Sequence, residues 1–128
     1  GSAAIASHMA VDFTKNKDIP SYAFNNASLL TCYANDFGYE NMFAEALDSY
    51  KIYQGDVLVA ISSSGRSKNI LNAVEKMKKY GPMVITLSGF EEDNPLSILG
   101  HINFHVPSHS YGIVEITHLA ILHSMVGV

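Results

Sequence analysis

A run of five apolar residues, Val57-Leu58-Val59-Ala60-Ile61, constrains the fold of this chain more than any other feature. A short, uninterrupted apolar run of this kind is typical of a strand buried on both faces, as in a parallel sheet. A second run, apolar except for Thr86, spans 83–87. The stretch 66–80 between the two runs has apolar residues on one side, which predicts a helix. Strand, helix and strand in this order predict a right-handed βαβ unit and the α/β class.

The rest of the chain continues this alternation of strands and helices. We expect further helices, further strands and one turn, with no internal repeat or linker. The expected helices are 2–15, 27–33, 41–50, a short 96–99 and 113–125; the expected strands are 22–24 and 101–106; and the expected turn is 35–38. The pattern predicts a three-layer, doubly wound parallel sheet and one domain over residues 1–128.

Composition excludes several classes of protein. Hydrophobic residues make up 48% of the chain and charged residues 16%, which excludes disorder and favours a surface partly covered by other subunits. The net charge of −4, without a basic stripe, indicates no nucleic-acid partner. No apolar run approaches the ~20 residues of a membrane span. The single cysteine, Cys32, we expect to be buried, and with no disulfide or secretory signal we expect a cytoplasmic protein.

The loop after the first apolar run carries four serines and one glycine. Ser62-Ser63-Ser64-Gly65-Arg66-Ser67 leaves the end of a buried strand and enters a helix, where open α/β sheets bind ligands. Gly65 allows the backbone to approach an anion, and the first amides of the helix are unpaired. A serine here could serve only as a helix cap, but four of them favour a phosphate site. Ser2 stands at the start of the first helix, after Gly1, and could be a second phosphate donor of the same kind.

Two helices carry matching polar residues on otherwise apolar surfaces. His8 and Asp12 are four positions apart on the first helix and therefore share a face. On the last helix, Glu115 precedes His118 by three positions and His123 by eight. Such residues could form a zinc site or an acid–base pair, or they could be His–carboxylate pairs within a helical subunit interface. Spacing alone leaves both interpretations open. We expect His101 and His105 to be ordinary strand residues and His109 to lie in a loop near the serines.

Seven segments, in order along the chain, carry a family resemblance. They are Gly1-Ser2-Ala3-Ala4 leading to His8, Asn35-Asp36-Phe37-Gly38, Gly55-Asp56-Val57-Leu58, Ile61 with the serine loop, Val84-Ile85-Thr86-Leu87-Ser88-Gly89, Val106-Pro107, and Glu115-x-x-His118. Together they resemble the sugar isomerase (SIS) domain, and within it the phosphoheptose isomerase branch.

The resemblance implies a flavodoxin-like parallel sheet, a homotetramer with active sites between subunits, and isomerisation of a ketose phosphate through an enediol. The substrate would be D-sedoheptulose 7-phosphate, in the synthesis of heptose precursors of lipopolysaccharide or capsule. The resemblance implies phosphate donors at Ser2, Ser62, Ser63, Ser64 and Ser67, with Asn35 and Asp36 on the sugar hydroxyls. It also implies a substrate contact at Glu115.

The same resemblance implies a catalytic pair and a metal site. Asp12 and His123 fall on the positions of the family's base and acid. Some members bind zinc through positions that correspond to His8, Asp12, Glu115 and His123. Asp12 stands where Glu is usual and Glu115 where Gln is usual, and the added negative charge favours a cation.

The start of the chain departs from the family pattern. Gly1-Ser2 enters a helix directly, whereas the family has a helical segment and a first strand before this turn. We therefore expect an N-terminally incomplete domain. The first hypothesis is a sedoheptulose 7-phosphate isomerase; the second is a non-catalytic SIS module that senses a phosphosugar or scaffolds a protein. A third is an isomerase of another phosphosugar.

Overall fold

The computed structural model describes residues 1–127, and a three-stranded parallel sheet lies at its centre. The strands are β1 (Val57–Ser62), β2 (Met83–Ser88) and β3 (Ile102–His105), in the order β1-β2-β3. The register places Ser62 beside Ser88, and Ser88 beside His105, so the carboxyl ends of all three strands meet at one edge. This edge positions the candidate site.

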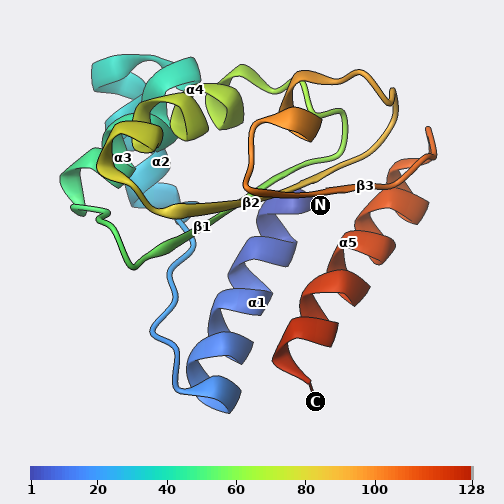
Figure 1. The fold of residues 1–128 in the computed structure, drawn as a ribbon. Helices are drawn as coiled ribbons and strands as arrows, with labels where there is room; N and C mark the ends of the chain where they lie inside the picture. Colours follow the sequence, from blue (N-terminus) through green and yellow to red (C-terminus); the bar gives the residue numbers. More distant parts are fainter. Residues whose placement is uncertain (128) are drawn as a thin grey trace.

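Helices cover both faces of the sheet (Figure 1). The helices α1 (Ser2–Lys17) and α5 (Tyr111–Val126) pack side by side on one face. The other face is covered by α4 (Lys68–Met77) and the short 3₁₀ helix η3 (Pro95–Ile98), with α3 (Met42–Ser49) against α4 and α2 (Ala27–Phe37) outside α3. The remaining 3₁₀ turns are η1 (Tyr39–Asn41) and η2 (Lys78–Tyr80). The expected three-layer α/β arrangement with a parallel sheet is thus confirmed.

The core divides into clusters on the two faces of the sheet. Ile5, Met9 and Leu122 from α1 and α5 pack against Ile61 and Leu87 on one face. Alternate residues of the same strands, Ala60 and Val84, point to the other face and pack against Val74 of α4 and Leu96 of η3. Side chains therefore alternate between two covered faces, which is why the strand sequences read as continuously apolar.

Three local expectations were wrong. Residues 22–24 form no strand, because nothing pairs with them and Tyr22 is exposed. Asn35 and Asp36 lie in the last turn of α2 rather than in a loop, and the helix ends only at Gly38, with φ +83. Cys32 is exposed, because α2 is an outer helix whose main packing partners are α3 and η1. In the described part of the chain, no helix combines the length and the apolar character needed to cross a membrane.

Candidate active site

Three helices begin at the carboxyl edge of the sheet. β1 leads through the serine loop into α4, and β3 leads within a few residues into α5. α1 begins near the same edge, since Ile5 packs against Ile61 and Leu87 close to the strand ends (Figure 1). The unpaired amides of a helix's first turn carry the positive end of its dipole, so this edge favours an anion.

The serine loop folds around Gly65. Its amide donates to the backbone oxygen of Ser62 at 3.0 Å and to Ser62 Oγ at 3.1 Å. Ser62 Oγ donates in turn to Ser67 Oγ at 3.2 Å. Gly65 has φ +65, and a Cβ there would overlap the side chain of Asn94 beneath it. Glycine is required at this turn both for the backbone angle and for space.

The serines of the loop differ in their exposure to solvent. Ser62 and Ser63 are buried, and Ser63 Oγ has no hydrogen-bond partner among the described residues. Ser64 is half-buried and accepts from the amide of Arg66 at 3.2 Å, while Ser67 is exposed just before α4. Ser2, the first residue of α1, is half-buried. Ser2, Ser64 and Ser67 therefore present the more accessible hydroxyls.

Asp12 lies between two histidines from different helices. Its Oδ2 is 3.4 Å from His8 Nε2, one turn earlier on α1, and 3.7 Å from His123 Nδ1 on α5. The two rings meet edge-on with their centroids 5.3 Å apart. The carboxylate is 18% exposed, against 54% for the His8 side chain and 35% for His123. One ligand atom from each residue lies within 4.8 Å of the others, a grouping that could hold a metal ion.

Glu115 does not join this group. Its Oε1 lies 3.8 Å from the backbone nitrogen of Gly1, at the opposite end of the α1–α5 contact. Because α5 rises about 1.5 Å per residue, the eight positions between Glu115 and His123 separate them by about 12 Å. Of the four residues expected to bind metal, His8, Asp12 and His123 thus lie together within one chain, and Glu115 lies apart from them.

His118 points into the core. It is 0% exposed, and its Nε2 donates to the backbone oxygen of Ser88, 2.9 Å away at the end of β2. Burial lowers the pKa of His118 below its usual value, so the ring is neutral near pH 7. Its Nδ1 has no partner in the described structure. His118 therefore belongs to the packing of α5 against the sheet and not to the group around Asp12.

Asn35 and Asp36 lie in the last turn of α2, just before η1, which packs against α4. Both are exposed, and the Asn35 amide donates to Asp36 Oδ1 at 3.1 Å. The stretch that follows them runs along α4: Lys68, next to Ser67, lies 3.5 Å from Glu40, and Asn72 donates to the Glu40 carbonyl at 3.0 Å. The two residues therefore lie on the same side of the molecule as the start of α4.

The turn after β2 contains residues that sequence reasoning missed. Asn94 is buried beneath the serine loop, and Phe90 adopts φ +57 with its ring stacked on His109, 5.8 Å between centroids. His109 Nε2 also lies 2.8 Å from Glu91. The pair Asn94-Pro95 is a helix-start signal that predicts a cap at this position. Nothing in the sequence indicates that this cap would be buried.

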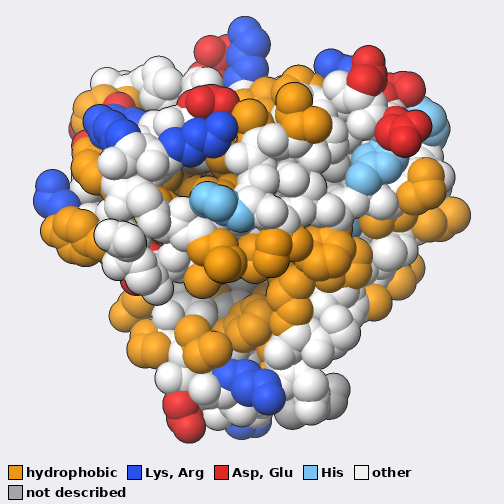
Figure 2. Space-filling model, viewed as in Figure 1, with side chains coloured by type: hydrophobic (Ala, Val, Ile, Leu, Met, Phe, Trp, Pro, Cys, Tyr) orange, Lys and Arg blue, Asp and Glu red, His pale blue; other side chains and the backbone are white. Residues whose placement is uncertain are grey.

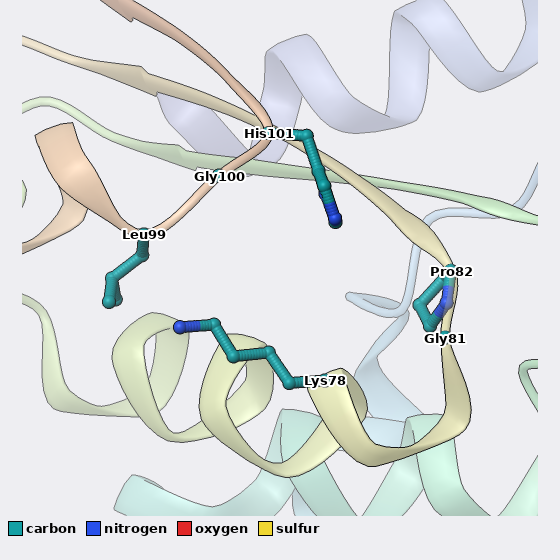
Figure 3. Close-up of a pocket in the computed structure, with 6 residues that line it drawn as sticks. All are labelled: Lys78, Gly81, Pro82, Leu99, Gly100 and His101. Carbon is teal, nitrogen blue, oxygen red and sulfur yellow. The ribbon is translucent and has the colours of Figure 1, made fainter.

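A hollow of about 290 Å³ lies at the opposite edge of the sheet (Figure 3). It is lined by Lys78, Gly81, Pro82, Leu99, Gly100 and His101. His101 Nδ1 accepts from the amide of Val84 at 2.9 Å, which accounts for this histidine structurally. The hollow lies at the amino ends of the strands, whereas parallel sheets bind ligands at the carboxyl ends. We therefore place the candidate site at the serine loop.

Comparison with known proteins identifies the family of this chain. A sequence model of the SIS domain matches residues 1–89, which include α1 and the serine loop. Phosphoheptose isomerase from Cytophaga hutchinsonii is 34% identical over 98% of this chain and 68% of its own length. This chain belongs to the SIS domain family, in its phosphoheptose isomerase branch.

Further relatives place the chain in the same branch. Phosphoheptose isomerase from Histophilus somni is 35% identical over 98% of this chain and 67% of its own length. The solved phosphoheptose isomerase from Neisseria gonorrhoeae superposes with a TM-score of 0.86 at 29% identity, covering 98% of this chain and 69% of that one. The one from Francisella tularensis gives 0.86 at 27% identity, with 98% and 68% covered. The chain thus spans about two thirds of the length of these relatives.

Proposed function

We propose that this chain isomerises D-sedoheptulose 7-phosphate to its aldose phosphate through an enediol, as one SIS domain over residues 1–128. The observation that carries the proposal is the Asp12 carboxylate held between His8 and His123, on the packed helices α1 and α5. A carboxylate beside an imidazole provides a base and an acid for proton transfer. The names of the relatives support the same activity.

The serine loop binds the phosphate in this proposal. Ser2, Ser64 and Ser67 supply accessible hydroxyls, Ser62 and Ser63 shape the loop beneath them, and the amides at the start of α4 complete the site. Neutral donors at a helix start can hold a phosphate monoester without a lysine. Asn35, Asp36 and Glu115 bind the sugar hydroxyls.

Asp12 and His123 perform the proton transfers. Asp12 removes a proton from C1 of the ketose while His123 protonates the carbonyl oxygen at C2, which gives the enediol. Asp12 then returns the proton to C2 and His123 accepts the proton of the C1 hydroxyl, which leaves an aldehyde at C1. No atom is gained or lost, and both groups end in their starting states.

Three residues would hold a zinc ion: His8, Asp12 and His123. Tetrahedral zinc with bonds of about 2.0–2.1 Å holds its ligand atoms roughly 3.3 Å apart. The separations of 3.4 and 3.7 Å are close to this spacing. Bound zinc would supply a Lewis acid that polarises the substrate carbonyl. Metal analysis of protein purified without chelator tests this proposal, and less than about a tenth of an equivalent, with activity unchanged by chelator, would refute it.

We further propose a cytoplasmic homotetramer. Val11 on α1 and Ile113 and Ile116 on α5 are 61%, 56% and 71% exposed, and large exposed apolar groups favour subunit contact. Figure 2 shows hydrophobic side chains at the surface in the lower half of the view, where α1 and α5 lie. Light scattering should give four times the chain mass, and an Ile116→Glu variant should give a smaller assembly. Wild-type monomers would exclude the tetramer.

The decisive experiment is an isomerase assay on the full-length protein. Sedoheptulose 7-phosphate should be converted to aldose phosphate by the wild type and not by His123→Ala. His101→Asn is the matched control, since it changes a histidine at the other edge and keeps an acceptor for the Val84 amide. Binding of the phosphosugar without turnover would identify a non-catalytic SIS module. Turnover of another phosphosugar alone would change the substrate and keep the mechanism.

A further inference from the structure

A chain of buried polar groups links α5 to the serine loop. His118 donates to the carbonyl of Ser88, Ser88 Oγ accepts from Asn94, and Asn94 packs beneath Gly65. His118 and Ser88 are 0% exposed, and Asn94 is 1% exposed. A role for these buried groups rests on the proposed binding of phosphate at the loop.

Among these buried groups, the Asn94 side chain makes the most hydrogen bonds. Its amide nitrogen lies 3.1 Å from Ser88 Oγ, 3.2 Å from the carbonyl of Gly89 and 2.8 Å from the carbonyl of Glu91. Its Oδ1 accepts from the amide of Ser97 at 3.0 Å and so caps η3. A side chain bonded on both ends and excluded from water is fixed in one rotamer.

The fixed side chain supports the loop from below. Asn94 occupies the space that a Cβ on Gly65 would require, and the amide of Leu96 donates to the Gly65 carbonyl at 3.2 Å. Gly65 is therefore held on one side by residues 94–96 and on the other by its bonds to Ser62. In the described structure Asn94 makes no hydrogen bond to the hydroxyls of Ser62–Ser67, so its influence on a phosphate passes through the shape of the loop.

At the other end of this set of buried polar groups, Ser88 contacts α5, the helix that carries His123. The Ser88 carbonyl accepts from His118 and also from the amide of Val106 at 2.9 Å. The next residue, Gly89, packs tightly: a Cβ there would lie 2.7 Å from Val114 on α5 and 3.0 Å from the carbonyl of Ser63. The end of β2 is thus clamped between α5 and the serine loop.

We propose that Asn94 is a positioning residue for the phosphate-binding loop, with Ser88 and His118 holding it in place. A phosphate bound by fixed amides and hydroxyls depends on their spacing, and a loop freed from below loses that preorganisation. Asp12 and His123 lie on the opposite face of the sheet from Asn94, so the proton-transfer groups keep their geometry.

Asn94→Ala tests the proposal through a split between binding and turnover. KM for sedoheptulose 7-phosphate and the inhibition constant of inorganic phosphate should both rise about tenfold, while kcat at saturation stays within about twofold. The control is Thr86→Val, which removes the hydroxyl of a 0% exposed side chain in β2 that is bonded to Asn103 at 2.6 Å, a partner outside the serine loop. It should lower the melting temperature and leave both constants unchanged.

The outcomes separate this inference from the proposed function. If Asn94→Ala lowers the melting temperature as Thr86→Val does, with KM and the phosphate constant unchanged, the positioning role is overturned. Should Asn94→Ala fail to fold, Ser88→Ala removes one of its acceptors and should raise both constants about threefold; unchanged constants overturn the proposal equally. A wild-type protein that neither binds phosphate nor turns over phosphosugar refutes the proposed function, and this inference with it.

Discussion

The serine loop and the group around Asp12 are built in opposite ways. The first half of the loop is buried, and the loop is closed by backbone hydrogen bonds and supported from below by Asn94. The Asp12 group consists of three side chains from two helices, at 3.4 and 3.7 Å, with one imidazole more than half exposed. The loop owes its geometry to the backbone, whereas the Asp12 group owes its geometry to the packing of α1 against α5.

This difference separates two tasks. A backbone-built loop has its donors in place before a ligand arrives, so it suits binding. The partly exposed side chains of the Asp12 group can be covered by a substrate, a metal ion or a second subunit. They therefore suit a step that moves protons. We therefore expect changes to the loop to alter KM and changes to the Asp12 group to alter kcat.

The largest expected effect comes from Asp12→Asn. The amide keeps the shape of the side chain and loses the base, so kcat should fall about 10³-fold, within the usual contribution of general acid–base catalysis. KM should remain within about threefold of wild type. Steady-state kinetics provide the measurement, with Asp18→Asn, at the end of the same helix, as the control. A large rise in KM at unchanged kcat would break the proposed separation.

Gly65→Ala should affect the loop by a smaller amount. Both the positive φ and the overlap with Asn94 oppose a Cβ, so KM should rise about tenfold and the free energy of unfolding should fall by about 2–3 kcal/mol. Gly81→Ala is the matched control, because Gly81 has φ +80 but its Cβ would meet only Gln54 at 3.6 Å. That variant should lose about 1 kcal/mol and keep the wild-type KM. Equal losses in the two variants would show that Asn94 yields to a methyl group.

The buried His118 predicts a pH dependence of stability rather than of activity. Its pKa is lowered in the folded state by burial, so the unfolded chain binds the proton more readily. The stability contributed by the neutral ring is present above the ordinary pKa of 6.5 and is lost as pH falls from there through the folded value. The loss approaches about 1.4 kcal/mol per pH unit for one proton. Urea unfolding between pH 7 and 5 measures it, and His118→Gln should show a flatter slope; an identical slope would exclude His118 as the source.

The smallest effect is expected from the exposed ion pair beside the loop. Arg66 lies 3.3 Å from Asp93, and both side chains are more than half exposed. Pairs of this kind contribute about 0–1 kcal/mol, so Asp93→Asn should change the free energy of unfolding by less than about 0.5 kcal/mol. Chemical denaturation checks the stability and the isomerase assay checks KM. A tenfold change in KM would show that the support of the loop extends beyond Asn94 to this surface pair.

The fold was predictable where short-range patterns carry the information. The apolar runs at 57–61 and 83–87 predicted two buried parallel strands, and the structure extends each by one serine. The stretch 22–24 failed because a strand needs a partner, which a local pattern does not reveal. Cys32 failed for a related reason: an apolar helical pattern indicates which side chains favour burial, while the number of neighbouring elements decides whether they are covered.

By itself, the sequence determined the parallel α/β sheet, the serine loop between strand and helix, and the shared face of His8 and Asp12, because each follows from spacing within one element. Only the tertiary structure decided that His123 joins Asp12 while Glu115 lies beside Gly1, since the register of α1 on α5 is set by packing against the sheet. It also decided that His118 is buried and that Asn94 supports Gly65. Such contacts join residues tens of positions apart, and no local period encodes them.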